Sequence, residues 1–298
     1  MRNPTLLGLT SIVLAGTMMN AEAITIAHGG NSVDIEFVDI GYAGNTGKTI
    51  SDGIGPDYTI GGVDYEYSIG KYEITADQWK DVAGFDALVE NNSRRPDPWS
   101  GSQPTARASW YEAAKFANWL TSGNARQGAY QFSDSDNFTG IDRATALATY
   151  GVIYVLPNQD EWYKAAYFKS DGSGYTTYTT GDSVPAGGID NNYRVPQDNI
   201  FPNGPWNVGS GTEENNGTYD MGGNVSEWSE GLSLGRAIYF ETNFQNPYYG
   251  SDVYDWRYPD DESEFIGFRV ASITAVPEPT STALLALGGL AVMMRRRR

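Results

Sequence analysis

Apolar and polar residues alternate along two short stretches in the first quarter of the chain. These stretches are Val33 to Ile40 and Tyr65 to Ile69. A period of two places successive side chains on opposite faces, so both stretches are predicted to be β-strands. The residues between them, 41–62, are rich in Gly, Thr and Asp and predict a loop.

Three later segments carry the start signal of an α-helix. Thr75, Ser109 and Asn158 are each followed three residues later by Gln or Glu. This spacing is a capping box, in which two side chains satisfy free backbone N–H groups at the helix start. Stretches 131–145 and 169–192 are polar and predict irregular structure. The pattern therefore predicts one α+β domain over 24–276, with three short helices and scattered antiparallel strands around an aromatic core.

The N-terminus has the three parts of a secretory signal peptide. Arg2 is followed by the apolar run 6–18 and then by the small residues Ala21 and Ala23, which flank Glu22. The alternative is a buried helix. We expect residues 1–23 to be a signal peptide, cleaved after Ala23, on an exported protein.

The C-terminus also carries three parts in a fixed order. Pro277, Glu278 and Pro279 precede an apolar run over 280–294 and four arginines over 295–298. The block resembles the PEP-CTERM sorting signal of Gram-negative bacteria, in which an exosortase acts at the Pro-Glu-Pro motif. The alternative is an ordinary tail anchor. The resemblance implies transient membrane anchoring through the apolar helix, then delivery to the cell surface or extracellular matrix.

Composition excludes several kinds of chemistry. The chain has 20 Lys and Arg against 37 Asp and Glu, no cysteine and one histidine, His28. No disulfide, zinc–thiolate site or cysteine nucleophile is possible. The acidic balance argues against nucleic acid as a partner, because the phosphate backbone attracts Lys and Arg. His28 follows the predicted cleavage site closely, so we expect it to be exposed.

Four blocks occur in one order along the chain and together identify a family. They run over 67–79, 109–120, 156–166 and 219–228, and a Gly-Phe-Arg sequence at 267–269 closes the series. Over 34–273 the chain resembles the formylglycine-generating, sulfatase-modifying factor family. The resemblance implies a C-type-lectin-like fold that is poor in regular secondary structure.

The chain departs from that family at the catalytic residues. Family members oxidise a substrate cysteine with two copper-binding cysteines placed before the Gly-Phe-Arg sequence, and here residues 235–265 contain no cysteine. Copper(I) prefers thiolate or thioether ligands, and non-haem iron prefers two imidazoles and a carboxylate. We therefore expect neither copper nor iron, no formylglycine-generating activity and no catalytic residue of that kind.

The resemblance also implies calcium at the block that contains Gly222 and Gly223. Calcium takes oxygen ligands from carboxylates, amides and backbone carbonyls. The candidate ligands are Asn224, Val225 and Glu227, with Asn192 in a second site. The alternative for Asn224 and Glu227 is a turn held by hydrogen bonds to the backbone. Arg269 is expected to be a buried ion-pair partner.

The segment 239–256 is dense in Tyr, Phe, Asn and Asp. Aromatic side chains of this kind supply wide contact area at low entropic cost in binding loops. The alternative is that they fill the core. The candidate ligand surface consists of Tyr239, Tyr248, Tyr249, Tyr254, Trp256 and Arg257.

These observations favour an exported, surface-sorted, non-catalytic module that is stabilised by calcium and binds a polysaccharide or a surface protein. The alternative is a hydrolase that uses a pair of carboxylates, since such an enzyme needs only two positioned Asp or Glu residues. A pocket with two such carboxylates would favour the alternative.

Overall fold

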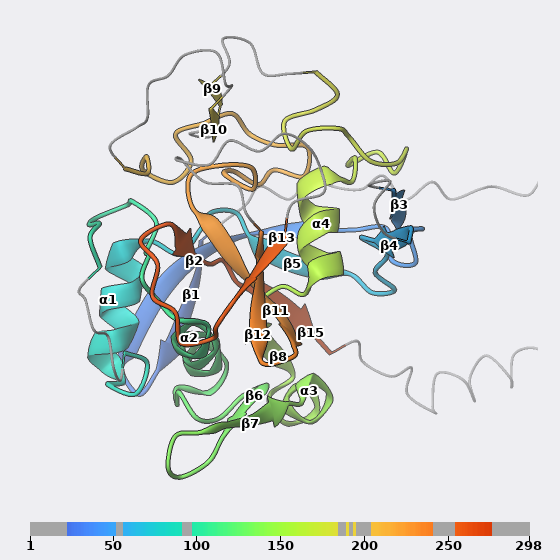
Figure 1. Ribbon diagram of the computed structural model, residues 1–298. Helices are drawn as coiled ribbons and strands as arrows, with labels where there is room; N and C mark the ends of the chain where they lie inside the picture. Colours follow the sequence, from blue (N-terminus) through green and yellow to red (C-terminus); the bar gives the residue numbers. More distant parts are fainter. Residues whose placement is uncertain are drawn as a thin grey trace, which may run out of the picture.

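The computed structural model describes residues 23–51, 56–90, 97–183, 189–190, 193–194, 204–240 and 254–275. The described residues form an α+β domain with two main sheets, four helices and three small hairpins (Figure 1). The predicted α+β class is confirmed. Asn192, Tyr248, Tyr249 and the 277–298 segment lie outside the described residues.

The larger sheet joins the two ends of the domain. Its order is β1-β2-β5-β15-β8, and every neighbouring pair is antiparallel. The strands are β1 (Ala23–His28), β2 (Asn31–Ile40), β5 (Tyr67–Gly70), β15 (Ala271–Thr274) and β8 (Val152–Val155). Because β15 is inserted between β5 and β8, the sheet is complete only when the C-terminal end of the domain is in place.

The predicted helix starts are confirmed. Helices α1 (Ala76–Phe85), α2 (Trp110–Ser122) and α4 (Gln159–Tyr167) each begin with a complete capping box. The structure adds a fourth helix, α3 (Arg143–Tyr150), so the predicted number of three was wrong. Its only buried residue is Ala146, and it therefore lacks the apolar stripe that reveals a helix in a sequence.

A second sheet has the order β13-β12-β11-β14. Its strands are β13 (Tyr254–Arg257), β12 (Arg236–Phe240), β11 (Ser226–Ser233) and β14 (Ile266–Gly267), and the β11–β14 pair is parallel. The remaining strands form three hairpins: β3 (Lys48–Ile50) with β4 (Tyr58–Ile60), β6 (Tyr130–Phe132) with β7 (Phe138–Ile141), and β9 (Ile189–Asp190) with β10 (Tyr193–Arg194). The first hairpin lies where 41–62 was predicted to be loop.

Aromatic side chains fill the core between the helices and the sheets. Trp79 of α1 stacks on Phe116 of α2 at 5.8 Å between ring centroids, and Phe268 meets both rings edge to face. Phe268 belongs to the Gly-Phe-Arg sequence, so this sequence anchors the two helices. Aromatic pairs in such geometries add to the free energy of burial.

His28 is not an exposed terminal residue, contrary to the expectation from its position. Its Nε2 lies 3.0 Å from the carbonyl oxygen of Leu120, and its ring packs edge to face on Trp119. The contact arises because β1 pairs with β2 along its whole length and ends beside the last turn of α2.

Gly267 is required by a close approach of two backbones. A Cβ atom at Gly267 would collide with the carbonyl oxygen of Thr105. We expect Gly267→Ala to lower the free energy of unfolding by about 1–3 kcal/mol, as overpacking does elsewhere. Urea unfolding of residues 24–276 measures the change.

Gly140→Ala is the matched control. Gly140 lies in β7, and a Cβ atom there would have nothing within 4 Å. The control is therefore expected to be neutral or slightly stabilising, because alanine restricts the unfolded chain. Equal destabilisation by both substitutions would contradict the argument from backbone contact.

Candidate functional site

Arg269 joins the two sheets from the centre of the core. Its side chain is fully buried, with 0% exposure. Nη2 lies 2.6 Å from a carboxylate oxygen of Glu227 on β11, and Nη1 donates to the carbonyl oxygen of Gly70 on β5 at 3.0 Å. A further bond runs from Nη2 to the carbonyl oxygen of Tyr219 at 2.9 Å. Arg269 is thus a buried ion-pair partner, as expected from the sequence.

Glu73 holds the Gly-Gly-Asn block from the other side. Its two carboxylate oxygens accept hydrogen bonds from Asn224 Nδ2 at 2.6 Å and from the backbone N–H of Val225 at 3.0 Å. Asn224 Oδ1 accepts from the backbone N–H of Trp206 at 2.8 Å. Asn224 has φ 49°, a left-handed conformation that asparagine tolerates better than most residues. The block is therefore a turn wrapped around a buried carboxylate.

The buried region around Arg269 contains more carboxyl groups than basic groups. Glu73, Glu214, Asp220 and Glu227 are all buried, and Arg269 interacts electrostatically with three of these carboxyl groups. Burial, followed by the negative charge of Asp220, raises the pKa of Glu73 well above its ordinary value. Burial also raises the pKa of Glu214 to about 7, against the opposing effect of Arg269. Protons therefore neutralise part of the cluster near neutral pH.

The predicted calcium ligands have protein partners in this structure. The carboxylate of Glu227 accepts from Arg269 and from Trp162 Nε1, the latter at 2.5 Å. The side-chain oxygen of Asn224 is held by Trp206, as described above. As placed, these side chains do not form an open cage of oxygen ligands. Within the described ranges, no group of three or more His, Asp or Glu side chains is arranged to hold a metal ion.

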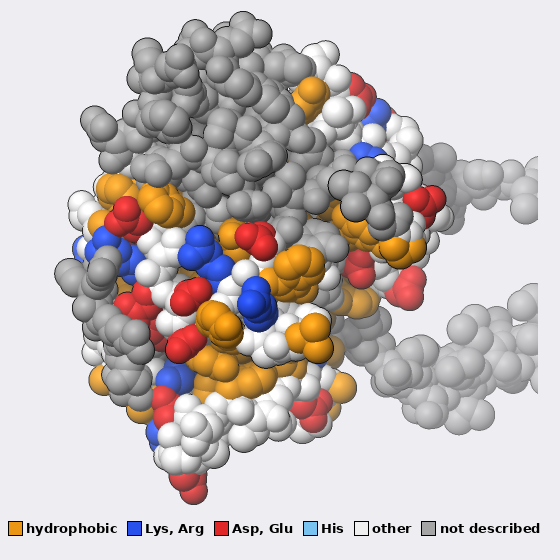
Figure 2. Space-filling model, viewed as in Figure 1, with side chains coloured by type: hydrophobic (Ala, Val, Ile, Leu, Met, Phe, Trp, Pro, Cys, Tyr) orange, Lys and Arg blue, Asp and Glu red, His pale blue; other side chains and the backbone are white. Residues whose placement is uncertain are grey.

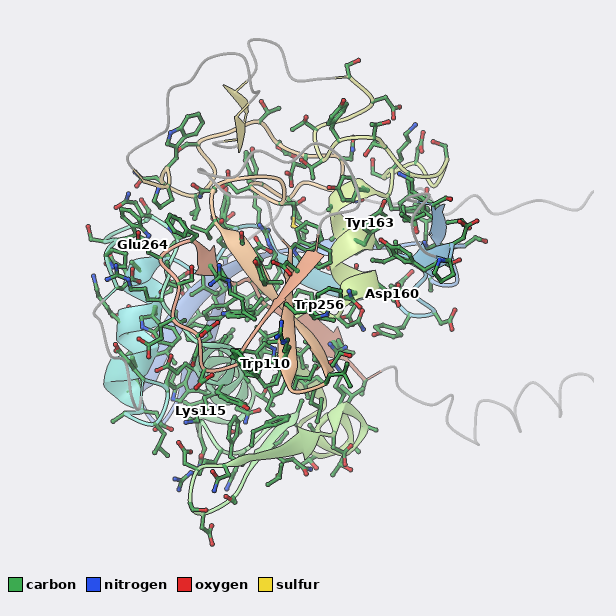
Figure 3. The ribbon with its side chains drawn as sticks, viewed as in Figure 1. Trp110, Lys115, Asp160, Tyr163, Trp256 and Glu264 are labelled. Atoms are coloured by element: carbon green, nitrogen blue, oxygen red, sulfur yellow. The ribbon has the colours of Figure 1, made fainter. Side chains whose placement is uncertain are left out.

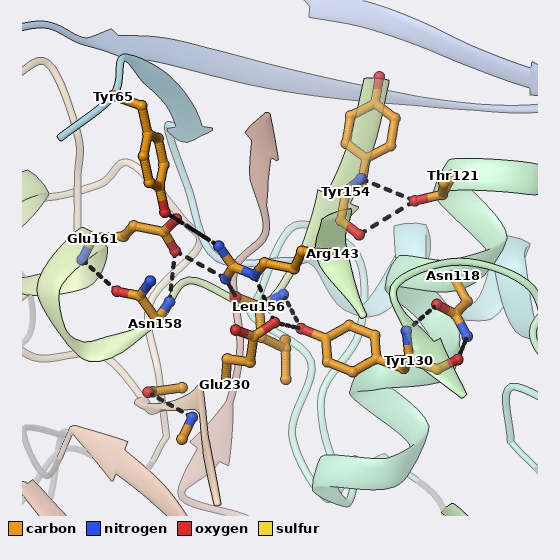
Figure 4. Close-up of polar contacts among 12 residues, drawn as sticks. Tyr65, Asn118, Thr121, Tyr130, Arg143, Tyr154, Leu156, Asn158, Glu161 and Glu230 are labelled. Carbon is orange, nitrogen blue, oxygen red and sulfur yellow. Dashed lines mark hydrogen bonds and ion pairs between the residues drawn. The ribbon is translucent and has the colours of Figure 1, made fainter. Parts of the chain in front are cut away.

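A second buried network links α3, α4 and β11 (Figure 4). Arg143 lies between Glu161 at 2.7 Å and Glu230 at 2.8 Å, and its pKa is raised by both carboxylates against the effect of burial. Tyr65 donates to Glu161 at 2.6 Å and Tyr130 donates to Glu230 at 3.0 Å. The two carboxylates are therefore bridged by one guanidinium, which compensates their charge and fixes the position of α3.

The candidate ligand surface lies on β13, at the edge of the second sheet. Trp256 is 43% exposed and Tyr258, just after the strand, is 57% exposed. The guanidinium of Arg236 on β12 lies 5.2 Å from the centre of the Tyr258 ring, within range of a cation–π contact. Figure 3 places Trp256 in the middle of the viewed face, and Figure 2 shows hydrophobic side chains interspersed with charged ones there.

The predicted surface residues divide into two groups. Trp256 and Arg257 are exposed, as a ligand surface requires. Tyr239 is 3% exposed, packs edge to face on Trp228 and donates to Asp255 at 3.1 Å. Tyr239 pairs with Asp255, the neighbour of Trp256 along β13, so its side chain lies on the opposite face of the sheet from Trp256. The backbone of Tyr254 is in β13, and its side chain is outside the described part of the chain.

The sequence analysis missed Tyr258 and Arg236 as surface residues. Alternation provides the signal that would have found them. Trp256 pairs with Ile238 across β12 and β13, so Arg236 and Tyr258 follow on the same face at a spacing of two.

Comparison with known proteins agrees with this fold and core. Residues 17–273 match the family described as "Sulfatase-modifying factor enzyme 1-like domain", and residues 275–298 match the "PEP-CTERM protein-sorting motif". The chain therefore belongs to the sulfatase-modifying factor family and carries a PEP-CTERM sorting signal, as the motifs predict. Such a signal indicates an exported protein that is sorted to the surface by exosortase-type machinery. No helix in the described ranges has the length and apolar character needed to cross a membrane.

Solved structures share the fold at low sequence identity. CarF is 22% identical, covering 80% of this chain and 97% of its own, with a TM-score of 0.55. Treponema denticola variable protein 1 is 18% identical, covering 84% and 98%, with a TM-score of 0.58. PvdO from Pseudomonas aeruginosa is 18% identical, covering 86% and 99%, with a TM-score of 0.54. These similarities establish the fold alone.

A curated relative is similar over part of its length. "Chaperone protein LppX" of Paenibacillus barcinonensis is 30% identical over 183 residues, which are 55% of this chain and 61% of the relative. The chain thus spans less than two thirds of that protein.

Removal of the Arg269 side chain tests its role in joining the sheets. Arg269→Met would leave Glu227 buried without its partner, and we expect a loss of about 3–5 kcal/mol in the free energy of unfolding. Lys169→Met is the control, because the Lys169–Asp182 pair is largely exposed, at 32% and 59%. The control is expected to cost less than about 1 kcal/mol. Similar losses in the two variants would show that burial of the Arg269 pair is not what matters.

The pKa of Glu214 makes stability depend on pH. A carboxyl group whose pKa is about 7 when folded and 4.5 when unfolded binds its proton more tightly in the folded state. Its stabilising contribution to the free energy of unfolding is therefore complete below pH 4.5 and is lost as pH rises through 7. The loss is roughly 3 kcal/mol at most, from 1.36 kcal/mol for each pKa unit.

Urea unfolding between pH 4.5 and 8 measures this effect. We expect Glu214→Gln to flatten the pH dependence, whereas Glu213→Gln, at an exposed neighbouring residue, should keep it. An unchanged slope in Glu214→Gln would assign the titration to another group.

Proposed function

We propose that this protein is a non-catalytic, surface-sorted module that binds an extracellular polysaccharide through its β12–β13 surface. The observation that carries the proposal is the exposure of Trp256 on the edge strand β13 and of Tyr258 just after it. Single exposed hydrophobic side chains are common, but neighbouring ones that form a patch mark interaction sites. The sorting signal supports an extracellular setting, where polysaccharides are abundant.

The chemistry of the surface suits a sugar polymer. The C–H face of a pyranose ring is apolar and packs on an aromatic ring, while its hydroxyl groups need hydrogen-bond partners at the rim. Trp256 and Tyr258 supply the rings, and Arg236 supplies hydrogen-bond donors beside them. Arg257 and Asp255 contact Tyr239 on the other face of the strand. Tyr239 and Trp228 pack together on the opposite face of the sheet and hold the strands in place.

The non-catalytic part of the proposal is supported by the residues available. The chain has no cysteine, and the Nε2 atom of its one histidine lies against the Leu120 carbonyl. Among the described carboxylates, Glu161 and Glu230 are both bonded to Arg143, and Glu73, Glu214, Asp220 and Glu227 are buried near Arg269. Catalytic pairs in glycosidases must instead reach the substrate from two sides.

A surface protein is the second candidate ligand. The similarity to a relative that is named a chaperone protein favours it. An edge strand with exposed aromatic side chains also suits a protein partner, which can extend the sheet by pairing with β13.

Calcium binding remains part of the proposal and rests on the family resemblance. Asn224 and Glu227 would have to exchange their bonds to Trp206 and Arg269 for a metal ion. Elemental analysis of residues 24–276, with Tm measured before and after chelation, decides the matter. Bound calcium and a fall in Tm would support the proposal, whereas no metal and an unchanged Tm would remove calcium from it.

Trp256→Ala tests the binding surface. We expect it to weaken binding to the recognised polysaccharide about tenfold, or ~1.4 kcal/mol, as loss of a central aromatic anchor does. Affinity electrophoresis in gels that contain a neutral β-glucan or a uronic-acid polymer measures the retardation of each variant.

Trp206→Ala is the matched control, because Trp206 is exposed to a similar degree, at 36%, and lies outside β12 and β13. It is expected to migrate like the parent protein. If both variants are retarded as strongly as the parent protein, the polysaccharide binds elsewhere on the surface. If neither polysaccharide retards the parent, a protein captured by the parent but not by Trp256→Ala would support the second candidate.

A further inference from the structure

One end of the larger sheet carries three exposed tyrosines. They are Tyr42, Tyr65 and Tyr150, which are 51%, 38% and 39% exposed. Tyr42 lies two residues after β2, Tyr65 two residues before β5, and Tyr150 two residues before β8. Because β2-β5-β15-β8 are consecutive antiparallel strands, these positions all lie at the same end of the sheet.

The chain leaves the domain toward its sorting signal at this same end. β15 ends at Thr274 between β5 and β8, and the next residue, Ala275, donates its N–H to Gly151 at 2.8 Å. Gly151 directly follows Tyr150. β1 runs antiparallel to β2, so the N-terminal end of β1 points toward this end of the sheet. Its first residue, Ala23, pairs with Glu36. In Figure 1 the end of β15 lies at the lower right of the domain.

The distance from this end to the membrane is limited by the length of the chain. Only four residues, 276–279, separate Ala275 from the apolar run that begins at Thr280. A chain of this length spans at most about 17 Å even when fully extended. The headgroup region on each side of a bilayer is itself roughly 5–8 Å thick. The tyrosine end of the sheet is thus held within reach of the headgroups while the apolar run is in the membrane.

We propose that the end of the sheet formed by Tyr42, Tyr65 and Tyr150 rests on the outer surface of the membrane before the sorting signal is processed. Tyrosine suits the boundary between water and lipid because its ring is apolar and its hydroxyl is polar. The inference rests on the surface sorting in the proposed function, and on the transient membrane anchoring that the resemblance to the sorting signal implies.

Contacts with the fold hold Tyr42 and Tyr65 in place, and Tyr150 is the last residue of α3. Tyr42 packs edge to face on Phe168 at 5.9 Å, and its carbonyl oxygen accepts a bond from Lys164. The hydroxyl of Tyr65 is bonded to Glu161. Exposed acidic residues, Asp64 and Glu66, flank Tyr65. The contact should therefore be stronger on zwitterionic than on anionic lipid, since like charges repel.

The candidate ligand surface belongs to a different sheet from the tyrosine end. Trp256 is on β13 of the second sheet, whereas Tyr42, Tyr65 and Tyr150 lie at the ends of strands of the larger sheet.

A single introduced cysteine tests the orientation, because the chain has none of its own. Ala43 and Ser32 are both exposed and lie near opposite ends of β2. One variant carries Ala43→Cys and the other carries Ser32→Cys. Each variant of the complete chain is labelled with an environment-sensitive fluorophore and reconstituted into phosphatidylcholine vesicles that contain a lipid with a nitroxide headgroup. We expect the label at 43 to be quenched severalfold more than the label at 32, and the difference to shrink when phosphatidylglycerol is added.

The outcomes separate the inference from the proposal on which it rests. Vesicle flotation of both variants with equal quenching would overturn the orientation alone. Failure of both to float would overturn the anchoring and the orientation together, while polysaccharide binding through Trp256 is measured separately and is unaffected. If the label at 43 is shielded from aqueous iodide without lipid, a second copy of the chain covers this end, and the proposal is wrong.

Tyr150→Ser in the Ala43→Cys background gives an independent test. The substitution removes one ring while leaving the Tyr65–Glu161 and Tyr42–Lys164 bonds in place, and Tm identifies any misfolded product. Reduced quenching at 43 would support contact through the tyrosines. Unchanged quenching would show that the short connection alone holds the domain near the lipid, which overturns a role for the tyrosines.

Discussion

The rest of the structure depends on the buried pair of Arg269 and Glu227. Arg269 follows β14 and precedes β15, while Glu227 is on β11, so the pair joins the second sheet to the first. A guanidinium can bond to a carboxylate and several carbonyl groups at once, and here it reaches Gly70 and Tyr219 as well. Because both charges are buried, neither can lose its partner without a large cost in stability.

Hydrogen bonds from buried side chains to the backbone explain how this fold holds together with little regular secondary structure. Long irregular segments have backbone groups that need partners, and buried side chains supply them. Glu73 accepts from the backbone N–H of Val225. Asn118 donates to the carbonyl oxygens of Ala125 and Tyr130, and Asn216 donates to carbonyl oxygens at the end of α4. Such hydrogen bonds replace the backbone–backbone hydrogen bonds of helices and sheets where the chain forms neither.

The proposed membrane contact and the proposed ligand surface belong to different sheets of this framework. The larger sheet ends in tyrosines where the chain continues toward the sorting signal, and the second sheet presents Trp256 and Tyr258 on an edge strand. If both proposals hold, the protein can meet its ligand while it is still anchored. Processing would then release a module whose binding surface is already formed.

The sequence by itself determined the local features, because they depend on residues that are close together in the chain. Three capping boxes, the strand at 33–40, the family motifs and the sorting signal were all readable from spacing. Helix α3 and the β3–β4 hairpin were missed, since they bury few side chains and leave a weak periodic signal. Only the tertiary structure decided that Glu227 faces Arg269, that Tyr239 is buried against Trp228, and that Tyr42, Tyr65 and Tyr150 share one end of a sheet. These relations join residues far apart in sequence, and strand order, which places β15 between β5 and β8, is what brings them together.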